Sequence, residues 1–350
     1  SPALGVAVKR THDMERLNRR DWLGLAAASA GTLLLPGCGT PTAGRATTAA
    51  VTPKTPVVPE SAGGPWPIDW RFGDVQVTKV LDVVEPFDAA RAYPGAPLGE
   101  FSANADWLPP YFYDPRKKAI VFSFHSYLVR TAGLTMIVDT CWGENTPLRP
   151  GRHDGRWLEN LAAAGVKPED VDVVTCTHFH SDHIGWNTRL RDGQWVPTFP
   201  RARHLFNAKE IAQLEAAVES GKTPARIYEQ SIQPILKSGH VIRLDGGYDV
   251  ADGVRIVPSH GHTPGHQHIE IASRGRRAVL SGDLIHNAIE IRHPEWTKLF
   301  DGDKDAARAT RTRFIDSLTD VDVTLMAAHF AGPTAGHVVS GAGGRKFKVI

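Results

Sequence analysis

The amino-acid sequence predicts a layered α/β fold with a functional site along one edge of a sheet. Strand-like and helix-like segments alternate from residue 75 onward, and histidine or aspartate residues directly follow several of the predicted strands. The composition supports a packed core, because 41% of the 350 residues are hydrophobic and 22% are charged. These three observations make a folded α/β domain the starting hypothesis.

The predicted strands share runs or alternation of apolar and β-branched residues. They span residues 75–84, 119–130, 135–139, 171–175, 254–258, 268–272, 278–281 and 323–328, the last of which closes the pattern. The predicted helices carry apolar residues at helical spacing and span residues 157–164, 208–219, 228–237 and 303–318. Gly165 is expected to end the first helix, and Pro234 to disturb the third.

Charge and cysteine content exclude some classes of protein. The net charge is +2 with no long basic run, which argues against a dedicated nucleic-acid-binding protein. The three cysteines, Cys38, Cys141 and Cys176, cannot form a disulfide framework. The outlier in the composition is histidine, with 16 residues, so the positions of the histidines decide the functional hypothesis.

The first 66 residues are not expected to belong to the fold. Residues 1–39 are interpreted as a leader with a Tat-like export signal, because Arg19-Arg20 precede an uncharged apolar stretch at 23–35 that is short for a membrane span. An amphipathic N-terminal helix is the alternative. The segment ending in Cys38 resembles a lipobox, which makes Cys38 a candidate lipid anchor.

Residues 40–66 are rich in Thr, Ala and Pro and are expected to form a linker. Residues 67–350 then form the folded domain. An exported protein, in the periplasm or on the cell surface, is the resulting expectation.

Potential metal ligands cluster after the predicted strand 171–175. His178, His180, Asp182 and His183 lie within six residues, so their side chains are expected to crowd one point in space. Imidazole and carboxylate together suit zinc or another first-row divalent ion. An isolated histidine at a strand end is usually a packing or surface residue, but this density favours a metal site.

Further polar residues follow other predicted strands. His262 lies in a Gly- and Pro-containing loop after strand 254–258, Asp283 follows strand 278–281, and His329 ends strand 323–328. Each residue alone is commonplace at a strand end, but together they indicate that these strands end at the same edge of the fold. Asp139 ends strand 135–139; it is expected to orient a ligand histidine or hold the histidine loop, or else simply to form a turn.

The motif His178-Phe179-His180-Ser181-Asp182-His183, the segment 261–266, Asp283 and His329 together resemble the metallo-β-lactamase superfamily. The resemblance covers residues 75–340. It implies an αββα sandwich, with two sheets face to face, helices outside and the metal site at one edge.

The same resemblance implies a dinuclear metal centre. The first ion would be held by His178, His180 and His262, and the second by Asp182, His183 and His329. Asp283 would bridge the two. The implied cofactors are two divalent metal ions per chain, with zinc as the first expectation and Fe, Co or Mn as alternatives.

Within the superfamily, the segments 282–286 and 327–330 resemble the branch of methyl-parathion hydrolases and acyl-homoserine lactonases. His286 stands where those lactonases carry a substrate-facing tyrosine and is expected to contact the substrate or the leaving group. Asp182 stands where antibiotic-degrading members commonly carry cysteine, which argues against β-lactam hydrolysis.

The implied function is hydrolysis of lactones or carboxylic esters by a metal-activated hydroxide. Asp182 and His286 are the candidate catalytic residues, and Asp182 is expected to accept the proton of the nucleophile or pass it on. The alternatives are phosphotriester hydrolysis at the same site, a mononuclear-iron persulfide dioxygenase and a non-catalytic metal-binding protein. The expected partner is a small-molecule substrate, and a homodimer is an open expectation.

Aromatic residues close to these motifs in sequence are candidates for the walls of an apolar cleft. They are Phe179, Trp186, Trp195, Trp296 and Phe330. His260, His266 and His268 are expected to shape the loop or face solvent and are not assigned to metal.

Overall fold

The computed structural model describes residues 68–108, 111–144 and 156–350. The predicted leader, the linker and Cys38 lie outside the described residues, so the export signal and the lipid anchor stay predictions. Within the described ranges, every helix is too short or too polar to span a bilayer.

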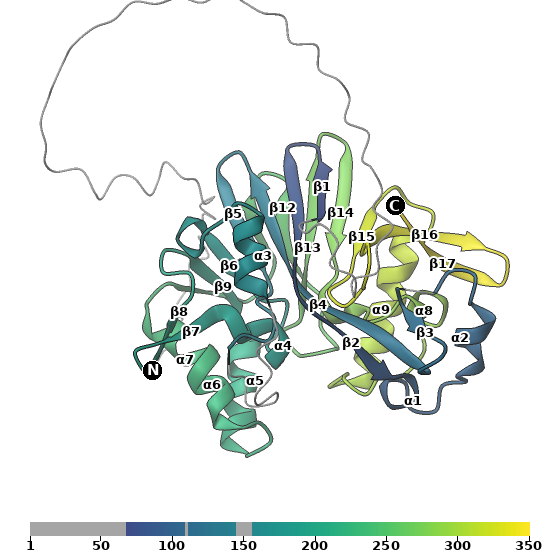
Figure 1. Ribbon diagram of the computed structural model, residues 1–350, viewed down its shortest axis with the longest axis horizontal. Helices are drawn as coiled ribbons and strands as arrows, with labels where there is room; N and C mark the ends of the chain where they lie inside the picture. Colours follow the sequence, from purple (N-terminus) through teal and green to yellow (C-terminus); the bar gives the residue numbers. More distant parts are fainter. Residues whose placement is uncertain (1–67, 109–110, 145–155) are drawn as a thin grey trace, which may run out of the picture.

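The first sheet comes from the N-terminal half of the domain (Figure 1). Its strands, in spatial order, are β1 (Ile68–Phe72), β2 (Val75–Asp88), β4 (Ala119–Thr131), β5 (Leu134–Val138), β6 (Val173–Thr175), β9 (Arg203–Asn207) and β10 (Val241–Leu244), with β3 (Tyr113–Asp114) paired to β4. The strands from β5 to β10 run parallel, so their carboxyl ends share one edge of the sheet.

The second sheet comes from the C-terminal half. Its strands, in spatial order, are β11 (Tyr248–Ala251), β12 (Val254–Pro258), β13 (Gln267–Ser273), β14 (Arg276–Leu280), β15 (Thr324–Met326), β16 (Ala335–Gly341) and β17 (Gly344–Val349). Two antiparallel pairings join β12, β13 and β14, and β15 pairs parallel with β14. The carboxyl ends of β12, β14 and β15 therefore also share one edge.

Helices and short 3₁₀ turns connect these strands. The α-helices are α1 (Ala89–Ala92), α2 (Gly99–Ala103), α3 (Trp157–Ala163), α4 (Ser181–Ile184), α5 (Ala208–Glu219), α6 (Ala225–Ser231), α7 (Gln233–Lys237), α8 (Ile289–Arg292) and α9 (Lys304–Leu318). The 3₁₀ turns are η3 (Pro168–Asp170), η4 (Gly185–Asn187) and η5 (Gly282–Leu284), and a separate hairpin pairs β7 (Thr188–Arg191) with β8 (Gln194–Pro197).

Alternation of side chains along the strands builds four layers. In β4, Val129 belongs to the core between the two sheets, whereas Leu128 packs in a cluster with Trp157 of α3. In β14, Leu280 faces the core between the sheets, and Val279 shares a cluster with Ile315 of α9. The predicted αββα sandwich is confirmed.

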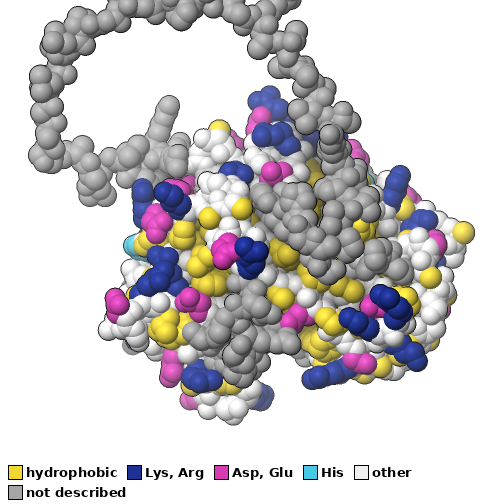
Figure 2. Space-filling view, viewed as in Figure 1, with side chains coloured by type: hydrophobic (Ala, Val, Ile, Leu, Met, Phe, Trp, Pro, Cys, Tyr) yellow, Lys and Arg dark blue, Asp and Glu magenta, His cyan; other side chains and the backbone are white. Residues whose placement is uncertain are grey.

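The arrangement of the helices can be followed in Figure 1, where α5, α6 and α7 gather at one end and α1, α2 and α8 at the other. Figure 2 shows basic and acidic side chains interspersed over the viewed face, so neither sign of charge dominates that face.

Two sequence predictions about the elements are wrong. The strand predicted at 323–328 does not close the pattern, because β16 and β17 follow it and extend the second sheet by two strands. The single helix predicted at 228–237 is two helices, α6 and α7, which separate at Ile232, so the disturbance expected from Pro234 is present as a complete break. Proline lacks the N–H that a continuous helix would need there.

A close contact between backbones fixes the segment that carries the histidine motif. The backbone N–H of Gly185 donates to Cys141 O (2.8 Å), and that of Trp186 donates to Thr140 O (2.8 Å). A Cβ at position 185 would overlap the backbone of Trp142 and Gly143. Only glycine allows this approach.

We therefore expect Gly185→Ala to lower the free energy of unfolding by about 1–3 kcal/mol, because backbone atoms cannot move aside as a flexible side chain would. Gly133→Ala is the control, since a Cβ there meets nothing within 4 Å. Urea unfolding of both variants with chelator present measures the difference. Equal midpoints would contradict the expectation.

Candidate metal centre

Three histidine side chains meet at the shared edge of the sheets. His178 and His180 follow β6, and His262 lies in the loop after β12. His178 Nε2 lies 2.9 Å from His180 Nδ1, and His262 Nε2 lies 3.2 Å and 3.0 Å from those two atoms. A tetrahedral zinc ion with bonds of about 2.0–2.1 Å separates its ligands by about 3.3–3.4 Å. The observed separations of 2.9–3.2 Å are slightly shorter, so a small outward movement of the rings would admit one such ion.

A second group forms beside the first. Asp182 and His183 lie on the single turn of α4, and His329 follows β15. Asp182 Oδ2 is 3.5 Å from the Nε2 atoms of both His183 and His329. The three ligand atoms lie within 4.8 Å of one another, which is close enough to share a second ion.

Asp283 lies between the two groups. It belongs to η5, after β14, and is 2% exposed. Its Oδ2 lies 3.5 Å from His178 Nε2 and 3.4 Å from His262 Nε2. The same oxygen is 3.3 Å from the Nε2 atoms of His183 and His329. One carboxylate thus faces both groups, as a bridging ligand would.

His266 holds the backbone of Asp283. The Asp283 N–H donates to His266 Nε2 (3.0 Å), and His266 Nδ1 lies 2.9 Å from Ser259 Oγ. Because its Nε2 accepts this hydrogen bond, His266 positions the backbone of Asp283 and is not one of the grouped candidate ligands. His260 and His268 belong to neither ligand group.

The structure brings together all seven side chains predicted from the sequence as ligands, and their assignment to metal stays a prediction. His286 also lies at the centre, with Nε2 3.1 Å from Asp283 Oδ2.

The outer nitrogens of four histidines face hydrogen-bond acceptors. The pairs are His178 Nδ1 with Thr177 Oγ1 (3.1 Å), His183 Nδ1 with Asp139 Oδ2 (3.0 Å), His262 Nδ1 with Asp301 Oδ1 (3.0 Å) and His329 Nδ1 with the Ser123 carbonyl (3.3 Å). An acceptor at Nδ1 favours the tautomer that carries its proton there, so the Nε2 lone pair points inward. In that tautomer the four rings direct Nε2 lone pairs to the place where a cation would bind.

Asp139 contacts both a candidate ligand histidine and the loop that carries the histidine motif. Its Oδ2 contacts His183, and its Oδ1 accepts a hydrogen bond from the Thr177 N–H (2.7 Å). Its φ of 60° lies in the left-handed region, which aspartate tolerates better than most residues. Asp139 lies in an irregular segment directly after β5 and not in a turn, so the alternative interpretation is not supported.

Burial and charge set the protonation of the ligands. Burial holds the pKa of His178 and of His262 well below the usual value, which leaves both rings neutral. Burial would also lower the pKa of His183, but Asp283, Asp139 and Asp182 outweigh it and raise that pKa well above normal. Without a metal, the second group thus retains protons that a cation would displace.

Glu210 joins the two histidine loops, a role that the sequence analysis missed. It lies in the first turn of α5 and is 2% exposed. Its carboxylate accepts hydrogen bonds from the Phe179 N–H (2.8 Å), Thr263 Oγ1 (2.6 Å) and the Gly265 N–H (2.7 Å). An acidic residue at a helix start is common, so the sequence alone gave no signal of this role.

A cleft of about 580 Å³ opens onto the centre. Asp182, Asp283, His286 and His329 lie in its floor. Its aromatic walls are Phe87, Phe122, Phe124, Trp142, Phe179 and Phe300.

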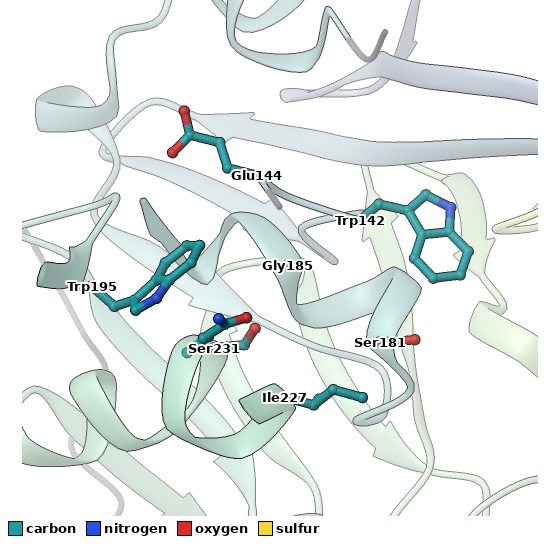
Figure 3. A pocket seen from close by; sticks show the side chains of 8 residues that line it. Trp142, Glu144, Ser181, Gly185, Trp195, Ile227 and Ser231 are labelled. Atoms are coloured by element: carbon teal, nitrogen blue, oxygen red, sulfur yellow. The ribbon is translucent and has the colours of Figure 1, made fainter. Parts of the chain in front are cut away.

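Four of the five aromatic residues predicted for the cleft lie elsewhere. Trp186 stacks on Trp157 at a centroid distance of 5.9 Å, and Trp296 and Phe330 are buried in the core beside α8 and α9. Trp195 borders a separate cavity of about 10 Å³, room for one water, together with Ser231 (Figure 3). Closeness in sequence to the motif did not mean closeness in space.

The two cysteines of the domain are not in the centre. Cys141 contacts Ser126 Oγ (3.4 Å), and Cys176 contacts Asn187 Oδ1 (3.7 Å). Burial raises the pKa of both thiols. The second ligand group therefore consists of nitrogen and oxygen atoms.

This sandwich, with a histidine and aspartate centre at one edge, defines a class of metal-dependent hydrolases. The metallo-beta-lactamase superfamily model matches residues 121–329, and the chain belongs to that superfamily.

Several curated relatives are lactonases. The chain is 26% identical over 169 residues to an N-acyl homoserine lactonase of a Bacillus species, covering 44% of this chain and 60% of that protein. It is 28% identical over 182 residues to the probable metallo-hydrolase YqjP of Bacillus subtilis, covering 45% of this chain and 51% of that protein. The chain thus spans about 60% of the length of the lactonases that it matches.

Solved structures of hydrolases share the fold. The hydrolase AbOPH superimposes with a TM-score of 0.68 at 26% identity, covering 81% of this chain and 97% of that one. AidC, a dizinc quorum-quenching lactonase, gives a TM-score of 0.67 at 23% identity with the same coverage.

Removal of the Glu210 carboxylate is expected to weaken metal binding. Glu210→Ala leaves two buried N–H groups unpaired and releases both histidine loops, so we expect a loss of about 10–100-fold in zinc affinity. Competition with a chromophoric chelator measures this loss. The control is Glu219→Ala, an exposed residue at the end of the same helix. Equal affinities in the two variants would contradict the role of Glu210.

Metal binding is expected to release protons. The carboxylates around His183 and His329 raise the pKa of both rings, which favours their protonated forms before metal binds, so apparent affinity should rise with pH. Calorimetry in buffers of different ionisation enthalpy counts the protons. Asp139→Asn should lower the count, because it removes a carboxylate that raises the pKa of His183. A buffer-independent enthalpy would refute the expectation.

Proposed function

We propose that this chain hydrolyses lactones or carboxylic esters at a centre that holds two divalent metal ions. The observation that carries the proposal is the position of Asp283 Oδ2, 3.3–3.5 Å from ligand nitrogens of both groups. Two complete ligand sets that share one carboxylate fit a dinuclear centre. Zinc suits these nitrogen and oxygen ligands, and Fe, Co or Mn would suit them too.

Metal ions held there would polarise the oxygen of the scissile carbonyl and lower the pKa of a bound water to about 7. The side chains of the chain then have separate tasks. Asp283 fixes the spacing of the two ligand groups. Asp182 is half-buried and lines the cleft, where the oxygen that does not face His183 and His329 can accept the proton of the nucleophile and pass it to the leaving group. His286 lines the same cleft and can donate a hydrogen bond to the substrate.

The cleft suits substrates with an apolar acyl or aryl group. Phe87 and Phe300 lie 5.4 Å apart, and Phe122 lies 6.1 Å from Phe300. The three rings form an apolar wall beside His286. Relatives named as N-acyl homoserine lactonases support a lactone with an apolar chain as the first substrate to test.

The test combines metal content with a panel of substrates: an acyl lactone, a p-nitrophenyl ester, paraoxon and a β-lactam. We expect two metal ions per chain and turnover of the lactone or the ester. Asp182→Asn should lower kcat by about 10²–10⁴-fold, because a carboxylate that transfers protons is lost. Asp305→Asn, on the exposed face of α9, is the matched control.

The outcomes separate the alternatives. Turnover of paraoxon alone would replace the proposal with a phosphotriesterase at the same site. One iron per chain without hydrolysis would favour a persulfide dioxygenase, and two metal ions without any turnover would favour a non-catalytic metal-binding protein.

A further inference from the structure

A buried lysine lies directly behind the metal centre. Lys298, in the segment between α8 and α9, is 1% exposed. Its Nζ lies 2.9 Å from His286 Nδ1 and donates to the carbonyl oxygens of Asp283 (3.1 Å) and Leu284 (3.2 Å). The ammonium therefore holds the turn that carries both Asp283 and His286.

Two buried carboxylates lie close to Lys298. Glu290 Oε2 lies 3.2 Å from its Nζ, and Asp301 Oδ1 lies 3.6 Å away. Arg311, also buried, contacts the other oxygen of Asp301 (3.3 Å). Two carboxylates thus balance two cations, which meets the requirement that buried charges be paired.

His286 differs from the predicted ligand histidines in what its outer nitrogen faces. Thr177, Asp139, Asp301 and the Ser123 carbonyl offer acceptors to four of the five predicted ligand histidines, whereas Lys298 offers His286 a donor. An ammonium has three N–H donors and no lone pair. His286 Nδ1 must accept, so the proton of the neutral ring lies on Nε2, which points at the cleft.

The plane of the His286 ring is fixed as well. It stacks on Phe300 at 5.3 Å with an interplanar angle of 12° and on His329 at 5.2 Å with an angle of 24°. Stacking fixes the plane of the ring, and within that plane the contact of Nδ1 with Lys298 Nζ (2.9 Å) favours the orientation with Nε2 toward the cleft. Lys298 and the two stacked rings therefore determine both the tautomer and the orientation of His286.

We propose that Lys298 is a positioning residue that makes His286 a hydrogen-bond donor into the cleft and keeps it from ligating metal. At rest the His286 Nε2–H donates to Asp283 Oδ2, at 3.1 Å. During turnover it donates to the oxygen of the substrate that gains negative charge. Only this last step rests on the proposed function, because the tautomer exists without substrate.

Nitrogen-15 NMR of histidine-labelled, zinc-loaded protein tests the tautomer directly. The His286 signals are assigned as those absent from His286→Gln. We expect a protonated Nε2 and an unprotonated Nδ1. A His286 with Nδ1 protonated and Nε2 bound to metal overturns the proposal, and this measurement on the unmodified chain is decisive even if the variants fail to fold.

Lys298→Met provides the second test. We expect the Nε2–H signature to be lost and, in the zinc-loaded fraction of the variant, kcat to fall by about 10–100-fold for esters with poor leaving groups, with KM little changed. Lys79→Met is the control, because Lys79 is another fully buried lysine, which donates to Phe330 O and Gly332 O. Its loss should lower stability and leave the His286 signals in place.

The results distinguish the two proposals. If no substrate is turned over but His286 carries its proton on Nε2, the proposed function fails and the role of Lys298 stands. If the substrates are turned over but Lys298→Met leaves the His286 signals and the leaving-group dependence unchanged, the role of Lys298 fails and the proposed function stands.

Discussion

The structure depends on one buried carboxylate surrounded by imidazole rings. Asp283 is 2% exposed, and five histidine side chains approach its Oδ2 within 3.1–3.5 Å. A carboxylate without water around it is tolerated only where positive charge or donors compensate it. The two sheets meet this need by directing the ends of separate strands to one edge, and four of these five histidines belong to the two candidate ligand groups.

Residues outside the two candidate ligand groups fix the positions of the ligand side chains. Asp139 lies after β5, Asp301 between α8 and α9, and Glu210 in α5. The first two favour one tautomer of a histidine ring, and the third holds two loops in place. Asp139 and Asp301 face the Nδ1 atoms of His183 and His262, whose Nε2 atoms point into the centre. Glu210 accepts hydrogen bonds from the two loops that carry ligand histidines. These contacts explain why a centre whose ligands lie on loops can have a defined geometry.

The strand-end pattern and the dense histidine motif are local signals, and they predicted a layered α/β fold with a site at one edge. The αββα sandwich and the full set of seven candidate ligands were implied by the resemblance to the superfamily. The sequence could not predict Glu210, Asp301 or Lys298, whose roles arise only from contacts with distant segments. The aromatic walls were mostly wrong for the same reason, since Phe87 and Phe122 reach the cleft through the pairing of β2 with β4. β17 carries an alternating pattern around the buried Phe347, a signal that was present and went unused.

The topology of the second sheet has a consequence for the order of events during folding. β15 pairs in parallel with β14 only after the chain has passed through α8 and α9, and His329 follows β15. Parallel pairing over such a long connection carries a large loop-closure entropy and is formed slowly. The nascent chain can therefore present His178, His180 and His183 to a metal long before the last ligand arrives, so an ion captured early would be held by an incomplete set until the C-terminal strands close the sheet.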